Sequence, residues 1–208
     1  MKHIKTLGLL AVAVMALAAV FGTASASAAK FTSTGGKQKL TTSKVKQHVF
    51  TVTGSTVTCE EVEFSGETPG AEATEQTVTP SYKKCTAFGL PAEVVTTGCT
   101  ITLKAATNAA GHAEAVVGGT KCESITILAK SIFGECHVDV TPQTVTGIHY
   151  VNNASPEDIT VQITASGMSD HVTKSSGVCP LTVGTHTNAS YTGEETVQTA
   201  GGVQYDAV

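Results

Sequence analysis

The sequence predicts an all-β fold: an antiparallel sandwich, Ig-like or jelly-roll-like, that is held together by disulfides. Three observations predict it. Threonine and valine alternate along much of the chain, turn-forming residues recur, and six cysteines follow an N-terminal export signal. β-Branched residues at a period of two are typical of half-buried strands. Turn signals spaced roughly 8 to 12 residues apart are typical of sandwiches.

The first element is an export signal. Lys2 and Lys5 precede an uncharged apolar run at residues 7–21, and the small residues at 23–29 offer A-x-A cleavage sites. A retained membrane anchor is the alternative, but the run is shorter than the about 20 residues that a spanning helix needs. We therefore predict a cleaved signal peptide at residues 1–28 and a single domain at residues 29–208. The mature protein is expected to be secreted, extracellular or associated with the cell envelope, with no membrane contact after cleavage.

The strands follow from the alternation. It is clearest at residues 49–58, 100–103 and 159–164. Turns are expected between the strands, because Gly, Pro, Asn and Ser cluster there. These turns lie at residues 53–55, 68–70, 108–112, 117–120, 152–156 and 165–167. A short helical turn is expected at residues 155–158, where Ser followed by Pro suits a helix start.

The cysteines are expected to form structural disulfides, because an even number of thiols in an oxidising compartment leaves none unpaired. They are Cys59, Cys85, Cys99, Cys122, Cys136 and Cys179. Three of them, Cys99, Cys136 and Cys179, alternate with apolar residues and are expected to face the core from strands. Cys122 breaks this pattern and is expected at a bulge or a strand start. Six cysteines allow 15 connectivities. We prefer the sequential one, Cys59 with Cys85, Cys99 with Cys122 and Cys136 with Cys179.

Composition argues against several partners. The 13 basic residues are all lysines, and the formal net charge is −4. Because arginine is the main donor to phosphates and guanine edges, we expect no nucleic-acid partner. The absence of tryptophan weakens a polysaccharide-binding role, which often uses flat aromatic platforms. Five lysines of the expected mature chain precede its first acid. They either dock on an anionic cell-wall polymer or form a solvated face, which we prefer. They are Lys30, Lys37, Lys39, Lys44 and Lys46.

Three segments carry a resemblance to a known set of proteins. They are TVTCEEVEFSGETPG at residues 56–70, PSYKKCTAFGLPAEVVTTGCTITL at residues 80–103 and GVCPLTVGTHTNASYTGEETV at residues 177–197. Together they resemble secreted, Thr/Val-rich, six-cysteine all-β proteins of actinobacteria, whose function is unassigned. The resemblance implies a bacterial exported protein of one domain. It carries over no catalytic residue, because its motifs are cysteines, glycines and turn residues.

Carboxylates near the first cysteine are one candidate for chemistry. Glu60, Glu61 and Glu63 flank Cys59, and Glu61 and Glu63 share one face of the expected strand. Paired carboxylates can hydrolyse glycosidic bonds when they lie about 5 to 10 Å apart across a sugar. Charges on an exposed strand face are the interpretation that we prefer.

Histidines supply two further candidates. His137 and Asp139 would share an outward strand face, and with His149 they could form a metal site or an acid–base pair. No ligand spacing repeats, so we prefer a polar outer face. Ser169, Asp170 and His171 include the residue types of a catalytic triad. Neighbours on a strand point to opposite faces, so they cannot relay a proton as a triad does.

No strong catalytic motif, such as G-x-S-x-G, H-E-x-x-H, C-x-x-C or a Walker loop, occurs in the sequence. We therefore expect a secreted, non-enzymatic structural or interaction module at or near the cell envelope, with an unknown protein or cell-wall partner and no cofactor or metal. One alternative is an extracellular hydrolase built from carboxylates and histidine. Another is a secreted protease inhibitor that presents Phe88-Gly89-Leu90-Pro91 as its loop.

Overall fold

The computed structural model describes residues 29–106, 112–154 and 158–206, which form fourteen strands and no helix. The strand pairings are antiparallel, so the predicted all-β antiparallel fold is confirmed. The predicted signal peptide, most of the turn at residues 108–112 and most of the helical turn at residues 155–158 lie outside the described residues. The described part of the chain contains no helix with the length and hydrophobicity needed to cross a membrane.

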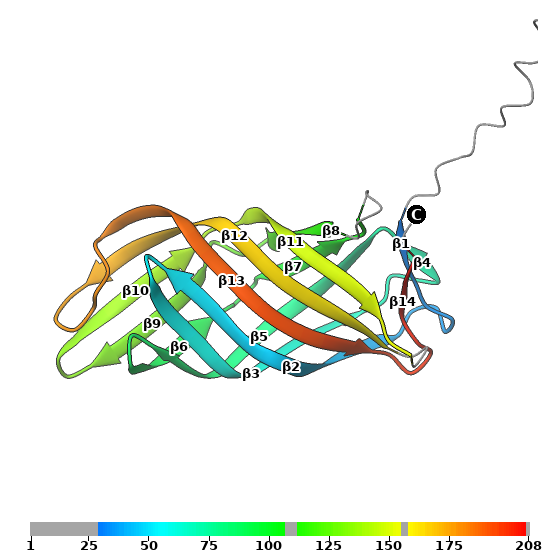
Figure 1. Ribbon diagram of the computed structural model, residues 1–208, viewed down its shortest axis with the longest axis horizontal. Helices are drawn as coiled ribbons and strands as arrows, with labels where there is room; N and C mark the ends of the chain where they lie inside the picture. Colours follow the sequence, from blue (N-terminus) through cyan, green and yellow to red (C-terminus); the bar gives the residue numbers. More distant parts are fainter. Residues whose placement is uncertain (1–28, 107–111, 155–157, 207–208) are drawn as a thin grey trace, which may run out of the picture.

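Five long strands make one wall of the molecule and cross it diagonally in Figure 1. They pair in the order β5-β3-β2-β13-β12. Their bounds are β2 (Lys39–Val52), β3 (Ser55–Glu67), β5 (Glu75–Ala87), β12 (Asp158–Ser175) and β13 (Gly184–Gln198). Apolar and polar side chains alternate along them, as in β5, where every second residue over most of its length is buried. One face of the wall therefore covers the core.

Two groups of three shorter strands complete the sheet. One group comprises β7 (Thr100–Lys104), β8 (His112–Gly118) and β11 (Gln143–Asn152), and the other comprises β6 (Leu90–Val95), β9 (Ile125–Ser131) and β10 (Gly134–Val140). The first group pairs with the N-terminal parts of β5 and β12, and the second pairs with their C-terminal parts. The sheet therefore closes on itself at both ends. The core lies between the long wall and the two groups, in a sandwich-like arrangement.

Two of the hairpin turns that have only two residues between their strands share one backbone geometry. Thr53 and Gly54 connect β2 to β3, and Phe88 and Gly89 connect β5 to β6. All four residues have positive φ angles, between 47° and 79°. This geometry is typical of type I′ turns, whose twist matches that of the flanking strands. The turn expected at residues 53–55 is therefore present.

The turn predicted at residues 165–167 is wrong. β12 continues through this segment, and the register with β13 shifts between Ala165 and Met168. Gly167 has a φ of 68° and takes part in this bulge. A glycine in the sequence indicates a bulge as well as a turn, since both need a residue that adopts positive φ. The chain bends there without reversing.

All six cysteines form disulfides, in the sequential pairs Cys59–Cys85, Cys99–Cys122 and Cys136–Cys179. The first joins directly opposed residues of β3 and β5. The second joins the β6–β7 connection to the β8–β9 connection, between the two groups of short strands. The third joins β10 to the β12–β13 connection. The strand expected around Cys179 is wrong, because this cysteine lies in a connection and is only half-buried.

A small separate sheet covers one end of the molecule. It consists of β1 (Lys30–Thr32), β4 (Glu72–Ala73) and β14 (Gln204–Asp206), in the order β14-β1-β4. Phe31 of β1 packs edge-on against Tyr150 of β11, and Tyr205 of β14 contacts both rings. The Tyr150 hydroxyl donates to the Lys104 carbonyl at 3.1 Å. These contacts close the core at this end.

Candidate functional site

A chain of four polar side chains crosses the core. His48 Nε2 lies 2.7 Å from Glu195 Oε1, and His48 Nδ1 lies 2.5 Å from the Tyr191 hydroxyl. The Tyr191 hydroxyl lies 3.2 Å from the Tyr82 hydroxyl. His48 is 2% exposed and Glu195 is 1% exposed. His48, Tyr191 and Tyr82 form a buried hydrogen-bonded network, and Glu195 adds an ion-pair contact to it in which neither His48 Nε2 nor Glu195 Oε1 has a hydrogen-bond partner among the described residues.

Strand pairing brings these residues together. His48 lies on the inward face of β2 with Phe50 and Val52, and Glu195 lies on the inward face of β13 with Val197. β2 and β13 are neighbours, and their register shifts around Glu194 and Glu195. The shift buries both glutamates, although consecutive residues of a regular strand point to opposite faces.

Burial holds the two tyrosines in their neutral form. Burial raises the pKa of Tyr82 to about 12, although its hydrogen bond to Tyr191 lowers the value. Burial also raises the pKa of Tyr191 well above its ordinary value. Both hydroxyls therefore carry their protons at neutral pH. They act as hydrogen-bond donors and acceptors, and neither is a nucleophile.

Two cavities lie beside this polar chain. The larger has a volume of about 90 Å³ and is lined by apolar side chains together with His48, Tyr82 and Tyr191. The smaller has a volume of about 40 Å³, and Glu195 is among the residues that line it. Ile101, Leu103 and Ile163 line both cavities, so the two spaces adjoin at these side chains.

The glutamates around Cys59 do not form a paired-carboxylate site. Glu61 and Glu63 lie on the exposed face of β3. Glu61 forms an ion pair with Lys84, and Glu63 Oε2 lies 3.7 Å from Lys83 Nζ. Glu60 is also exposed. Each of the two shared-face carboxylates thus has a cationic neighbour on β5, as expected of a solvated strand face.

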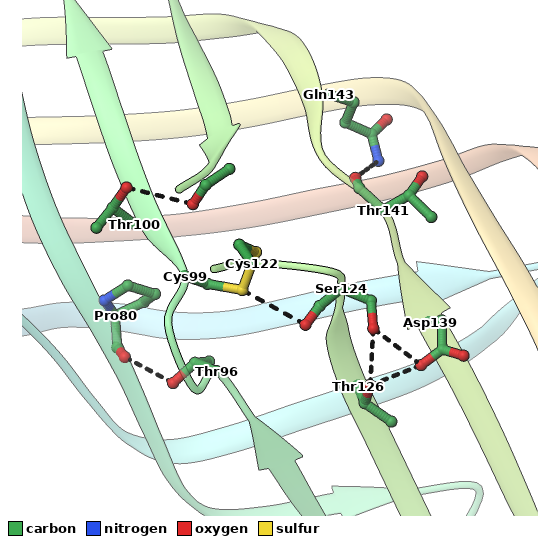
Figure 2. Close-up of a disulfide and its surroundings, with 11 residues drawn as sticks. Pro80, Thr96, Cys99, Thr100, Cys122, Ser124, Thr126, Asp139, Thr141 and Gln143 are labelled. Atoms are coloured by element: carbon green, nitrogen blue, oxygen red, sulfur yellow. Dashed lines mark hydrogen bonds between the residues drawn. A yellow bond between two sulfur atoms is a disulfide. The ribbon is translucent and has the colours of Figure 1, made fainter. Parts of the chain in front are cut away.

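The three residues of the second candidate have separate partners. His137 Nε2 lies 3.2 Å from Glu135 Oε2 on the same strand. Asp139 Oδ1 accepts hydrogen bonds from Thr126 at 2.6 Å and from Ser124 at 3.3 Å, as Figure 2 shows. His149 lies on β11, opposite His112 of β8, with ring centroids 5.7 Å apart. The structure therefore does not bring His149 to His137 and Asp139.

The side chains of Asp170 and His171 point to opposite sides of β12, as expected of consecutive residues on a strand. Asp170 is buried, whereas the His171 ring lies on the outer side, with Nδ1 at 3.0 Å from Thr185 Oγ1. The backbone N–H of Ser169 donates to Gln143 Oε1 at 2.8 Å. Burial raises the pKa of Asp170, although the nearby charges of His186 and His171 lower it. Neither carboxylate oxygen of Asp170 accepts a hydrogen bond from a described residue.

The segment considered for an inhibitor is part of a tight hairpin. Phe88 and Gly89 form its two-residue turn, and Leu90 and Pro91 already belong to β6. Phe88 and Leu90 are half-buried and pack against the core. The segment therefore presents a compact turn, whereas a loop that inserts into a protease cleft needs an extended exposed stretch.

Among the early lysines, Lys30 and Lys46 have acidic partners. Lys30 Nζ lies 2.7 Å from Glu72 Oε1, and Lys46 Nζ lies 2.6 Å from Glu194 Oε2. Lys37 and Lys39 are exposed. Part of the positive charge that would attract an anionic polymer is thus matched by acids within the protein.

Exposed apolar side chains gather at the end opposite the small sheet, on two connections at the left of Figure 1. Ile132 (92% exposed) and Phe133 (70% exposed) form the β9–β10 turn, and the exposed Val178 and Val183 belong to the β12–β13 connection. The Cys136–Cys179 disulfide ties β10, which follows the β9–β10 turn, to the β12–β13 connection. The backbone N–H of Ser176 also donates to the Glu135 carbonyl at 3.0 Å. We call Ile132, Phe133, Val178 and Val183 the apolar end.

Among the described residues, no group of three or more His, Cys, Asp or Glu side chains is arranged to hold a metal ion. Comparisons with protein-family models, with curated proteins and with solved structures found no match. The resemblance to the actinobacterial set therefore stays a prediction.

The polar chain and the apolar end were not among the candidates from the sequence. A signal for the polar chain exists, because His48 and Glu195 stand at apolar positions of alternating strands. A polar residue at such a position indicates a buried, hydrogen-bonded group. The signal for Ile132 and Phe133 is weaker. Two adjacent apolar residues before a glycine fit a buried strand as well as an exposed turn.

Proposed function

We propose that the mature chain is a secreted, non-enzymatic interaction module that acts at or near the cell envelope and docks a protein partner with its apolar end. The proposal rests on the exposure of Ile132 and Phe133 at the tip of a hairpin. Clustered apolar side chains on a protein surface mark sites of interaction. An isolated exposed valine such as Val45 does not call for such an explanation.

The construction of the apolar end supports a role in binding. The disulfide and two hydrogen bonds between Ser176 and Glu135 restrain the β12–β13 connection against β10 before a partner arrives. One of these hydrogen bonds joins backbone groups, and in the other the Glu135 N–H donates to the Ser176 hydroxyl. A preorganised surface loses less conformational entropy on association. Phe133 provides an aromatic anchor at the tip, and aromatic side chains that enter a partner's pocket carry much of the binding energy at interfaces.

A protein fits the apolar end better than an anionic polymer or an anionic membrane. The chain has a formal net charge of −4, so long-range electrostatics oppose approach to an anionic surface. The lysines that could offset this charge include Lys30 and Lys46, which are paired with acids. The carboxylates and histidines of the hydrolase alternative lie on separate faces with partners of their own, and this arrangement gives that alternative less support.

The test compares a tip variant with a matched surface variant. The mature protein is immobilised with its disulfides formed and exposed to the culture medium and envelope proteins of the organism that produces it. The double variant Ile132→Ser/Phe133→Ser should lose the captured partner, whereas Val45→Ser should retain it. With the purified partner, loss of an anchor of this kind should weaken the Kd by roughly 30-fold or more, which corresponds to about 2 kcal/mol.

Three outcomes would overturn the proposal. The tip variant could capture the same partner with an unchanged Kd, which would place the interface elsewhere. The wild type could associate only with itself in a tip-dependent manner, which would make the apolar end a homodimer interface. It could also bind vesicles of the producing organism's lipids through the tip and no protein, which would make the apolar end a membrane anchor.

A further inference from the structure

The two adjacent cavities in the core have features of a ligand-binding site. The larger cavity lies between the long wall and both groups of short strands, with Phe50, Ile127 and Ile148 among its lining residues. A cavity lined by apolar groups stays dry and binds small apolar molecules, since water finds too few hydrogen-bond partners there. The larger cavity therefore offers space for an apolar body.

The smaller cavity adds one open polar group. Glu195 lines it, and Glu195 Oε2 is buried and accepts no hydrogen bond from a described residue. Its other oxygen lies 2.7 Å from His48 Nε2. A buried acceptor without a donor is costly, and the cost is higher for a charged group. A ligand that brings a donor to Oε2 would remove this cost.

The hydrogen-bonded chain determines which kind of group fits. The Tyr82 hydroxyl can donate to Tyr191, whose hydroxyl can donate to His48 Nδ1. His48 then carries its proton on Nε2, which lies 2.7 Å from Glu195 Oε1 without forming a hydrogen bond of good geometry to it. Both tyrosine hydroxyls are used as donors in this arrangement. Glu195 Oε2 remains as an acceptor, so the complementary ligand group is a donor.

The volumes limit the size of the ligand. A cavity of about 150 Å³ in another protein binds benzene, which has six heavy atoms. On that scale the larger and smaller cavities of about 90 and 40 Å³ together accommodate roughly four to six heavy atoms. A neutral hydroxyl suits the site better than an ammonium group, because moving a cation out of water into an apolar cavity carries a large desolvation cost.

We propose that these two cavities and Glu195 form a binding site for a short-chain aliphatic alcohol, with the hydrocarbon body in the larger cavity and the hydroxyl donating to Glu195 Oε2. The site is separate from the apolar end in both its residues and its place in the fold. Its ligand is a small molecule, whereas the apolar end is proposed to dock a protein. Either proposal can therefore be disproved without affecting the other.

The test uses isobutanol as the hydroxyl probe and xenon as an apolar probe of the same space, on the disulfide-bonded mature protein. NMR titration should detect saturable binding of both probes, with shifts at Ile148 and Ile163. Glu195→Gln removes the carboxylate with little change in size, and it should weaken isobutanol binding roughly tenfold or more while changing xenon binding less than twofold. Ala115→Leu fills the larger cavity from β8 and should abolish binding of both probes while the protein stays folded.

A crystal soaked in isobutanol gives a second readout, which keeps the proposal testable even if Glu195→Gln fails to fold. The hydroxyl oxygen should lie within hydrogen-bond distance of Glu195 Oε2. The proposal is overturned if isobutanol does not bind, if its hydroxyl lies elsewhere, or if ordered water alone occupies the smaller cavity in the soaked crystal. It is equally overturned if Glu195→Gln weakens xenon and isobutanol binding to the same extent, because the carboxylate would then support the cavity without recognising the hydroxyl.

Discussion

Asp170 is the residue whose ionisation should make the protein less stable at neutral pH. Its side chain is buried and neither oxygen accepts a hydrogen bond from a described residue. Burial raises its pKa, and the charges of His186 and His171 lower it by less. A carboxyl whose pKa is raised in the folded state stabilises the fold below its unfolded pKa of about 3.9. That stabilisation is lost as the pH rises through the folded pKa.

Asp170→Asn should therefore stabilise the protein at neutral pH. We expect a gain of about 1 to 2 kcal/mol in the free energy of unfolding at pH 7, because a buried charge without a hydrogen bond is removed. The gain should shrink as the pH falls and vanish near pH 3.5, where both states of the wild type bind the proton. Urea unfolding between pH 3.5 and pH 7.5 measures it.

Asp139→Asn is the matched control, because Asp139 accepts hydrogen bonds from Thr126 and Ser124. Removing its charge weakens two hydrogen bonds, so this variant should be less stable than the wild type at pH 7. If Asp170→Asn also destabilises at pH 7, the Asp170 carboxylate is satisfied in solution and the predicted pH dependence is wrong.

The residues of the polar chain show which features of single side chains could be predicted from the sequence. His48 and Glu195 stand at inward positions among valines and phenylalanine, so their burial could be predicted from the period of two. Their contact could not, because 146 residues separate them and the register shift between β2 and β13 places Glu195. Glu194 and Glu195 are both buried as neighbours, which the period of two excludes for a regular strand.

At the scale of single elements, the β2–β3 turn contains an unfavourable residue. Thr53 has a φ of 47°, a conformation that costs a β-branched residue roughly 1 to 2 kcal/mol. Asn adopts this region more readily, and Asn-Gly is the preferred pair of a type I′ turn. Thr53→Asn should therefore raise the free energy of unfolding by about 1 kcal/mol, measured by urea or thermal unfolding.

Ser55→Asn is the matched control for this turn. It introduces the same side chain two positions later, where β3 has begun and Asn is disfavoured. We expect unchanged or lower stability. A gain in Ser55→Asn equal to that in Thr53→Asn would mean that asparagine acts through solvation and that the turn geometry is irrelevant.

The strands with clear alternation were predictable because each buries one face. Residues 49–58, 100–103 and 159–164 all lie mainly in strands. The segment around Cys179 alternates in the same way, yet it forms a connection in which Leu181 is buried and Val183 is exposed. This segment is held in place by its disulfide to Cys136 and by a hydrogen bond that the Ser175 hydroxyl donates to the Leu181 carbonyl, and strand pairing does not contribute. Alternation alone does not reveal whether a segment has a neighbour to pair with.

At the scale of the whole molecule, the closure of the sheet could not be predicted from the sequence. β5 pairs with β7 along its first part and with β6 along its last part, and β12 pairs with β11 and β10 in the same divided way. Local patterns carry no information about which distant strands share an edge. The sequential disulfides were preferred from the sequence, but 15 connectivities remained open there. Pairing Cys59 with Cys85 depends on β3 and β5 lying in register.

The shared long strands predict that the molecule unfolds as one unit. β5 and β12 belong to the closure at both ends, so neither group of short strands can detach without freeing edges of the same two strands. Ile127 of β9 and Ile148 of β11 are both buried, one in each group. Ile127→Ala and Ile148→Ala should each destabilise by about 2 to 5 kcal/mol.

In calorimetry of the disulfide-bonded protein, both variants should shift one and the same transition. The calorimetric and van't Hoff enthalpies should agree for the wild type and for each variant, as in all-or-none unfolding. Two domains would behave differently. A second transition that moves in Ile127→Ala and stays in place in Ile148→Ala would show that the group of β6, β9 and β10 unfolds by itself. Only when the two groups unfold independently does the loss of one buried isoleucine leave the stability of the other group unchanged.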